Sequence, residues 1–161
     1  MKLMLVCTSG GHFSTMRGLK QFWSQHERVW VTDLKQDTQM IAGKEKVYWL
    51  PYQAPRDLFA IVKNFPATMR ILRQEQPAMV ICTGASLAIN FAIAAKLTRH
   101  KFIYIESISR SKDLSISGKI VYPIADEFYV QWQQLTAKYP KALFKGTVTA
   151  SVTPAYSSKV A

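Results

Sequence analysis

Two stretches of this chain combine residue types that can carry out chemistry. The first, here called the glycine loop, is CTSGGH at residues 7–12, directly after the apolar run MKLMLV. Glycines let a backbone turn tightly and approach a ligand closely, and the amides that open the next helix would face an anion such as phosphate. His12 would stand at the positive end of that helix, which favours the neutral imidazole that can take a proton from a sugar hydroxyl. The loop predicts either an anion cradle with a base or a plain strand-to-helix turn capped by a histidine.

The second stretch is YIESISRSKDLSISGK at residues 104–119, in which a carboxylate ends an apolar run. Glu106 would be costly to bury there without a purpose or a partner. Arg110 is near enough in the sequence to be that partner, so a structural ion pair is the alternative to a catalytic carboxylate. Ser115 and Ser117 precede Gly118 and a short helical pattern, which again offers amides to an anion. This stretch therefore predicts a second candidate base and a second anion-binding turn.

A shorter stretch, CTGAS at residues 82–86, repeats the arrangement of the glycine loop. Gly84 permits a turn after an apolar run. Ser86 can cap the following helix or donate a hydrogen bond to a ligand oxygen. Helix capping is the preferred interpretation, and ligand contact is the alternative.

The elements that must position these stretches alternate along the chain. Runs such as LMLV and MVIC have no polar face, which is typical of parallel strands covered by helices on both sides. The pattern predicts a doubly wound, Rossmann-like α/β domain at residues 1–146 and a weakly structured tail at 147–161. Ligands of such sheets bind outside the carboxyl ends of the strands, where the polar stretches lie. We expect strands at residues 2–8, 28–33, 46–50, 78–83, 101–106, 127–131 and 143–146, and helices at 12–24, 55–76, 85–98, 117–125 and 132–139.

The charge balance favours an anionic partner. Lys and Arg number 21 while Asp and Glu number 10, which gives a formal net charge of +11. Nucleic acid, an acidic membrane surface and a phosphate-bearing substrate would each fit this excess. The basic residues are spread along the chain without a dense cluster or an interleaved aromatic platform, so we expect no nucleic-acid partner.

Cysteine and histidine usage argues against a metal or disulfide framework. Cys7 and Cys82 fall inside apolar runs, so we expect both to be buried in the core, and this usage suits a protein in a reducing compartment. The histidines are isolated from further ligand pairs. We therefore expect no metal and no cofactor. The apolar stretch at residues 87–97 is interrupted by Asn90 and Lys96 and is too short to span a bilayer, and no signal peptide pattern opens the chain. Membrane contact is expected to be peripheral, on the inner face of the cell membrane.

The helical pattern at residues 55–76 has two faces. Its apolar residues follow the i, i+3/i+4 rule, and its basic residues recur every seven positions on the opposite side, with Pro66 expected to kink the middle. Phe59 and Ile71 lie off the apolar stripe and are expected to be exposed. Such a helix could bind the surface of an anionic membrane. Alternatively, it could cover the protein core with its apolar side and expose its basic side to solvent. The stripe is Leu58, Ile61, Val62, Phe65, Met69 and Leu72, and the membrane-contact candidates are Arg56, Leu58, Phe59, Lys63, Phe65 and Arg70.

Longer patterns carry a resemblance to a known family. They are GGH after the first strand, YIES-x-x-R-x-x-x-LSISGK-x-x-YPIAD-x-F-x-VQW-x-x-L from residue 104, and YPKALFKG ending at residue 146. The chain resembles, over nearly its whole length, the acceptor-side, membrane-recruiting subunit of the two-part UDP-N-acetylglucosamine transferase of dolichol-linked glycan synthesis. It is also similar to bacterial counterparts in capsular and exopolysaccharide synthesis.

The resemblance implies one lobe of a split GT-B fold. The chain would be the acceptor-binding subunit of an inverting glycosyltransferase that moves a sugar from a UDP-sugar to a lipid-diphosphate-linked saccharide. A separate donor-binding subunit would supply the UDP-sugar, and this chain would be inactive without it. By match to the family, His12 is the first candidate for the base and Glu106 is the second. The candidate acceptor- and phosphate-binding residues are Ser9, Gly10, Gly11, Gly84, Ser86, Ser107, Arg110, Lys112 and Lys119.

Two departures from the family pattern matter. Eukaryotic members begin with a hydrophobic anchor that this sequence does not show, so the resemblance is to the bacterial branch. The loop continues FSTM where the eukaryotic pattern places an acidic residue before the methionine, so no role of that acid is carried over.

The alternative function is a self-contained nucleotide-binding regulatory module. It rests on the glycine loop and on Asp33, which ends the second expected strand at a suggestive distance. The loop lacks the third glycine of the dinucleotide fingerprint, which argues against this alternative.

Overall fold

The computed structural model describes residues 1–53 and 57–148, and residues 54–56 and 149–161 lie outside the described residues. The chain alternates between strands and helices in the order expected from the sequence. The strands are β1 (Lys2–Val6), β2 (Glu27–Thr32), β3 (Val47–Trp49), β4 (Met79–Cys82), β5 (Lys101–Ile105), β6 (Glu127–Val130) and β7 (Ala142–Phe144). The helices are α1 (Gly11–Gly18), α2 (Lys20–Trp23), the 3₁₀ helix η1 (Thr38–Ile41), α3 (Leu58–Glu75), α4 (Leu87–Thr98), α5 (Ile116–Val121) and α6 (Leu135–Lys138).

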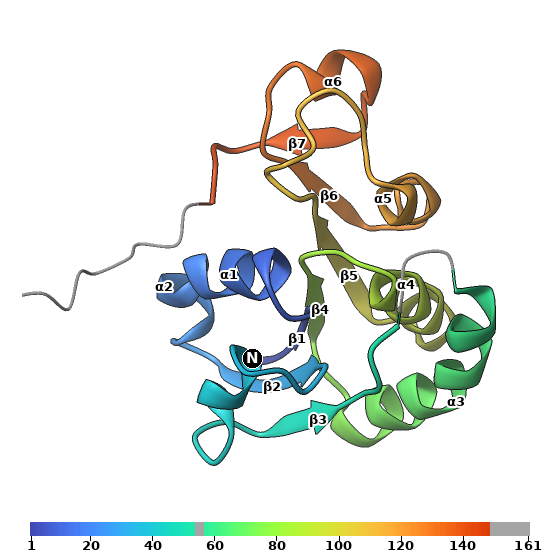
Figure 1. The fold of residues 1–161 in the computed structure, drawn as a ribbon. Coiled ribbons are helices and arrows are strands. Elements are labelled where there is room, and N and C mark those ends of the chain that lie inside the picture. Colours follow the sequence, from blue (N-terminus) through green and yellow to red (C-terminus); the bar gives the residue numbers. More distant parts are fainter. Residues whose placement is uncertain (54–56, 149–161) are drawn as a thin grey trace, which may run out of the picture.

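The strands form one parallel sheet of seven in the order β3-β2-β1-β4-β5-β6-β7. Figure 1 shows α1 and α2 on one face of the sheet and α3, α4 and α5 on the other. The chain first builds one half of the sheet from β1 to β3 and then returns to the other side of β1 to add β4 to β7. Because crossovers between parallel strands are right-handed, this reversal places the helices of the two halves on opposite faces. The predicted doubly wound, Rossmann-like fold is confirmed.

Alternation along β1 divides the core between the two faces. Leu3 and Leu5 pack with Trp30 on the side of α1 and α2, while Met4 and Val6 pack on the side of α3 and α4. This is the period of two expected of a strand buried on both sides. Cys7 and Cys82 are free and buried, as predicted, and burial raises the pKa of Cys82 to about 12.

Several helix boundaries differ from the prediction. The helix expected at residues 12–24 divides at Leu19 into α1 and α2, and η1 was not predicted. Helix α3 is continuous through Pro66 and ends at Glu75, and its predicted start at Pro55 lies outside the described residues. Shortfalls of this size at helix ends come from local hydrogen bonds that hydrophobic periodicity does not report.

The buried face of α3 is more polar than its apolar stripe predicted. Asn64 and Thr68 are buried while Val62 is 71% exposed, so the prediction for Val62 was wrong. Ile71 was expected on the surface and is 3% exposed, which corrects a second position. Phe59 is 77% exposed, as predicted. The Asn64 and Thr68 side chains are satisfied inside the protein, although the periodicity argument assigned them to solvent. The Asn64 side chain donates to the Gln53 side chain, and the Thr68 hydroxyl donates to the Asn64 carbonyl.

The outer face of α3 mixes apolar and basic side chains. Lys63 and Arg70 are exposed, and Phe65 is half-buried. Of the other membrane-contact candidates, Arg56 and the side chain of Leu58 lie outside what the structure describes. Across the described parts of the chain, no helix is both long enough and apolar enough to cross a bilayer.

The predicted tail begins with two residues bound to the domain. The Thr147 hydroxyl donates to the backbone carbonyl of Gln131 at 3.4 Å, and the Val148 amide donates to the Gln131 side chain at 2.8 Å. The rest of the tail lies outside the described residues. The division into a domain at 1–146 and a tail therefore stays a prediction.

A buried carboxylate ties the amino ends of β1 and β3 to the end of α3. Glu75 is 3% exposed and pairs at 2.6 Å with both Lys2 and Lys46. The Tyr48 hydroxyl also donates to it. Burial alone would raise the pKa of Glu75, but the hydrogen bonds from Lys2, Lys46 and Tyr48 outweigh it and lower the pKa from 4.5 to about 2.

Glu75 is expected to make stability depend on pH between about 4.5 and 2. Because its pKa is lower in the folded state, its stabilisation is present above the unfolded pKa and is lost as the pH falls through the folded value. A shift of this size corresponds to about 3 kcal/mol. Urea titrations between pH 7 and pH 2.5 should show a smaller fall in unfolding free energy for Glu75→Gln than for the parent chain. Equal pH slopes in the two proteins would contradict this assignment.

Candidate active site

The His12 imidazole is held in one orientation at the carboxyl edge of the sheet. Its Nδ1 lies 2.6 Å from the Thr83 backbone carbonyl, which can only accept, so Nδ1 carries the proton. The Thr83 hydroxyl donates in return to the His12 carbonyl at 2.7 Å. These two bonds join the start of α1 to the end of β4. They leave Nε2 of the half-buried His12 as the nitrogen that can accept a proton from a substrate hydroxyl.

Gly84 provides the space beside that imidazole. Its φ is +121°, a region that residues with a side chain rarely adopt. A Cβ at this position would lie 2.5 Å from Cε1 and 2.6 Å from Nδ1 of His12. Glycine is therefore required at this position because the His12 ring lies close to the Gly84 backbone. The sequence had suggested only a turn at Gly84.

The glycine loop is held by carboxylates of the chain itself. The Ser9 amide donates to Asp33 at 2.6 Å and the Ser9 hydroxyl donates to the same carboxylate at 2.9 Å. The Gly10 amide donates to Asp37 at 2.6 Å. Asp33 is 1% exposed. Internal carboxylates therefore already accept the hydrogen bonds of the Ser9 and Gly10 amides, whereas the amides that were expected to face an anion are those that open α1, from Gly11 on.

Glu106 is fully buried and is paired with serines instead of a cation. The Ser107 amide donates to one carboxylate oxygen at 2.8 Å, and the Ser115 amide and hydroxyl donate to the other at 2.9 Å. Among residues 1–53 and 57–148, no ion pair joins Glu106 to Arg110, so the alternative of a structural ion pair was wrong. A Cβ on Gly118 would lie 2.2 Å from the carboxylate, which explains a glycine inside α5. Glu106 closes the ends of the loop at residues 107–114.

Tyr104 brings the two candidate bases into one neighbourhood. Its hydroxyl lies 3.3 Å from the Ser115 hydroxyl, which binds Glu106. The same tyrosine hydroxyl would be 3.4 Å from a Cβ on Gly84, the position that also contacts His12. Burial, reinforced by the charge of Glu106, raises the pKa of Tyr104 well above its usual value. Sequence reasoning missed Tyr104, although a tyrosine inside an otherwise apolar strand two residues before Glu106 could have drawn attention to it.

Side chains after β6 fix the loop at residues 107–114. The Trp132 indole donates to the Ile108 carbonyl at 2.6 Å, and the Gln134 amide donates to the Ser111 carbonyl at 3.0 Å. Gln131, which is 2% exposed, donates to the backbone carbonyl of Glu106 at 2.9 Å. The loop is therefore anchored along its length by the segment that follows β6.

Asp113 anchors the far end of the loop and engages one of the predicted phosphate ligands. Its carboxylate pairs with Lys119 at 2.6 Å and with Lys138 at 2.9 Å. Hydrogen bonds from Lys119, Tyr139 and Lys138 hold the pKa of Asp113 well below its usual range. Lys119 is thus engaged by Asp113, which it shares with Lys138, while Arg110 and Lys112 are exposed on the loop that contains Asp113.

Ser86 stands at the N-terminus of α4, but its side chain is buried. It is 2% exposed, and its hydroxyl donates to the Gln53 carbonyl at 2.6 Å. It makes no side-chain cap to α4. The prediction of a side-chain cap was therefore wrong, and contact of Ser86 with a ligand stays a prediction.

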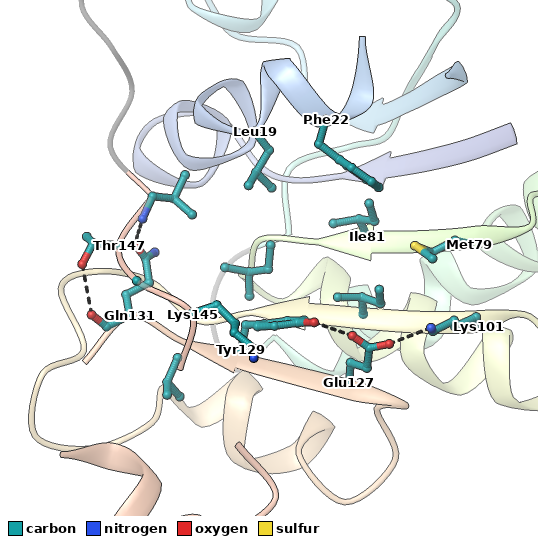
Figure 2. A pocket seen from close by; sticks show the side chains of 15 residues that line it. Leu19, Phe22, Met79, Ile81, Lys101, Glu127, Tyr129, Gln131, Lys145 and Thr147 are labelled. Carbon is teal, nitrogen blue, oxygen red and sulfur yellow. Dashed lines mark hydrogen bonds and ion pairs between the residues drawn. The ribbon is translucent and has the colours of Figure 1, made fainter. Parts of the chain in front are cut away.

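A separate pocket of about 420 Å³ lies on the sheet face that bears α1 and α2. Figure 2 shows Ile81 and Met79 of β4 pointing into it, with the ion pair of Lys101 and Glu127 at its border. Its lining is mostly apolar, and none of the candidate bases or predicted acceptor-binding residues lines it. The candidate active site is therefore the carboxyl edge, with the pocket standing apart from it.

Curated proteins with one shared name are similar to this chain. The UDP-N-acetylglucosamine transferase subunit ALG14 of Yarrowia lipolytica is 29% identical over 174 residues, covering 90% of this chain and 80% of the relative. The human protein of the same name is 30% identical over 100 residues, covering 58% of this chain and 46% of the human protein.

Solved structures share the fold at low sequence identity. MurG of Acinetobacter baumannii has a TM-score of 0.72 at 15% identity, and the likeness covers 91% of this chain and 45% of MurG. MnaA of S. aureus, solved with UDP, has a TM-score of 0.74 at 16% identity, covering 98% of this chain and 49% of MnaA. This chain therefore spans less than half of either structure.

A family model matches the part of the chain that contains most of the site. It describes Alg14-like oligosaccharide biosynthesis proteins and matches residues 53–148, more than half of the chain. The match includes Gly84, Tyr104 and Glu106 with the anchored loop, whereas His12 precedes it. By this match the chain belongs to the family of Alg14-like oligosaccharide biosynthesis proteins.

Proposed function

We propose that this chain is the acceptor-binding, membrane-recruiting subunit of a two-component inverting glycosyltransferase. The enzyme moves a sugar from a UDP-sugar to a lipid-diphosphate-linked saccharide, and a separate donor-binding subunit supplies the UDP-sugar. The observation that carries the proposal is His12, whose Nδ1–H is fixed on Thr83 so that Nε2 is free to accept a proton at the ligand-binding edge of the sheet.

The name of a relative supports a divided enzyme. The Yarrowia lipolytica relative is named as a transferase subunit. The likeness to MurG covers 45% of that chain, which agrees with one lobe of a GT-B fold. With the donor lobe on another chain, activity requires the pair.

The proposed membrane contact is the outer face of α3, on an anionic inner leaflet. Phe59 and Val62 expose apolar surface there, and Lys63 and Arg70 add positive charge. Apolar side chains bordered by cations bind the interface of acidic bilayers. The alternative is that this face of α3 is simply exposed to solvent, which would favour polar residues at positions 59 and 62. The 71% exposure of Val62 argues against it.

The biological setting remains a prediction. The relatives named above come from yeast and human and are named for UDP-N-acetylglucosamine transfer. Assignment to capsular or exopolysaccharide synthesis rests only on the sequence resemblance to the bacterial branch.

Reconstitution tests the proposed reaction. The full chain, a candidate donor-binding subunit, a UDP-sugar and a lipid-diphosphate-sugar are expected to give product together, with no product when either protein is left out. Several UDP-sugars would be tried, since the donor pocket is assigned to the other subunit. Turnover by this chain alone, or no turnover with any pair and sugar, would refute the proposal.

The alternative of a self-contained nucleotide-binding module now has less support. Asp33, which would have to bind a ribose, is 1% exposed and accepts two hydrogen bonds from Ser9. Calorimetry with NAD and NADP should therefore detect no tight binding by the isolated chain.

A further inference from the structure

The two loops at the carboxyl edge differ in charge and in the use of their backbone amides. At the glycine loop, Asp33 and Asp37 place two carboxylates on the amides of Ser9 and Gly10. A helix N-terminus supplies only about half a positive charge. Lys35 lies between these two aspartates in the sequence, and its ammonium lies over the Tyr52 ring. An entering diphosphate would meet net negative charge here.

Asp33 cannot turn away to make room for a diphosphate. It is 1% exposed and binds both the amide and the hydroxyl of Ser9, so its displacement would leave three buried or half-buried polar groups without partners. Asp37 holds the Gly10 amide at the surface. The Ser9 and Gly10 end of the glycine loop is therefore already occupied by carboxylates and is poorly suited to bind an anion.

The loop at residues 107–114 has the opposite character. Arg110 and Lys112 are exposed, and neither forms an ion pair with any residue in the two described ranges. The Ser107 and Ser109 hydroxyls lie 3.0 Å apart beside them. Glu106, Trp132 and Gln134 fix the backbone of the loop. Because the backbone is already fixed, binding a dianion would order only the two cationic side chains and not the loop itself.

The distance between the loops fits the two ends of one acceptor. The glycine loop follows β1 and the other loop follows β5, with β4 between them. Two strand spacings amount to about 10 Å. A hexose whose hydroxyl reaches His12 can therefore direct its phosphate-bearing carbon toward Arg110 and Lys112.

We propose that the acceptor diphosphate binds at the loop of residues 107–114, through Arg110 and Lys112, and that Ser9 and Gly10 of the glycine loop do not contact it. This inference rests on the proposed function for the identity of the acceptor. It moves the phosphate contact away from Ser9 and Gly10 and fixes the direction in which the acceptor lies across the edge of the sheet.

The binding test uses the full ¹⁵N-labelled chain, inorganic pyrophosphate and amide chemical shifts. Pyrophosphate is expected to shift the amides of residues 107–112, and the double substitution Arg110→Gln/Lys112→Gln should weaken binding about tenfold or more. The matched control Lys20→Gln/Lys44→Gln removes the same charge from exposed positions elsewhere and should have little effect. Shifts centred on residues 9–11, equal weakening by the control, or no binding at millimolar pyrophosphate would each overturn the proposal.

Steady-state kinetics of the reconstituted pair identify which diphosphate is bound. Arg110→Gln/Lys112→Gln should raise KM for the lipid-diphosphate acceptor at least tenfold and leave KM for the UDP-sugar unchanged. A rise in KM for the UDP-sugar alone would overturn the assignment to the acceptor. If no pair turns over, the proposed function fails, and the chemical shifts still decide where pyrophosphate binds.

Discussion

Replacing His12 with alanine is expected to lower kcat of the reconstituted pair about 10²- to 10⁴-fold, the usual contribution of a positioned general base. The side chain is half-buried, its Nδ1–H is committed to the Thr83 carbonyl, and its free nitrogen is therefore a proton acceptor. KM for the acceptor should change by less than a few-fold, because the phosphate-binding loop is intact. Initial rates at saturating and subsaturating acceptor separate the two parameters.

Glu106→Gln is the comparison that ranks the two candidate bases. The Glu106 carboxylate accepts three hydrogen bonds from Ser107 and Ser115, so it is already occupied and is fully buried. We therefore expect its substitution to raise KM for the acceptor by disturbing the loop, with a smaller loss in kcat than His12→Ala. A kcat loss for Glu106→Gln that equals or exceeds that of His12→Ala would contradict the choice of His12.

The sequence was sufficient to predict the fold because its strongest signals are local. All seven strands were placed near their observed positions, since a short apolar run followed by turn residues specifies a buried parallel strand. Chain order then leaves few topologies, because crossovers in parallel sheets are right-handed. The position of His12 and Glu106 at one edge followed from the same reasoning.

The partners of the site residues could not be predicted, because they are distant in sequence. Asp33 reaches Ser9 across 24 residues and Thr83 reaches His12 across 71. Nearness in the chain suggested Arg110 as the partner of Glu106, whereas Ser115 binds it nine residues away. Periodicity places a side chain on a face of an element, but it does not report which polar groups of another element satisfy it.

Gly118→Ala is expected to destabilise the chain by about 1–3 kcal/mol, the range for overpacking a filled site. The added methyl would lie 2.2 Å from a Glu106 carboxylate oxygen and 3.0 Å from the Ser115 hydroxyl. Either the carboxylate or α5 must shift, and the hydrogen bonds that close the loop at residues 107–114 would weaken. Urea denaturation measures the stability, and trypsin cleavage after Arg110 or Lys112 measures the release of the loop.

Gly11→Ala is the matched control, because it adds the same methyl at a helical glycine with nothing within 4 Å. Alanine at an unstrained glycine restricts the unfolded chain, so this substitution should be neutral or stabilise by up to about 1 kcal/mol. Trypsin should then cut the control at the parental rate and cut Gly118→Ala faster. Equal stability and equal cleavage in the two variants would mean that the Glu106 carboxylate can move without opening the loop. Its three hydrogen bonds would then not be what holds Arg110 and Lys112 in place.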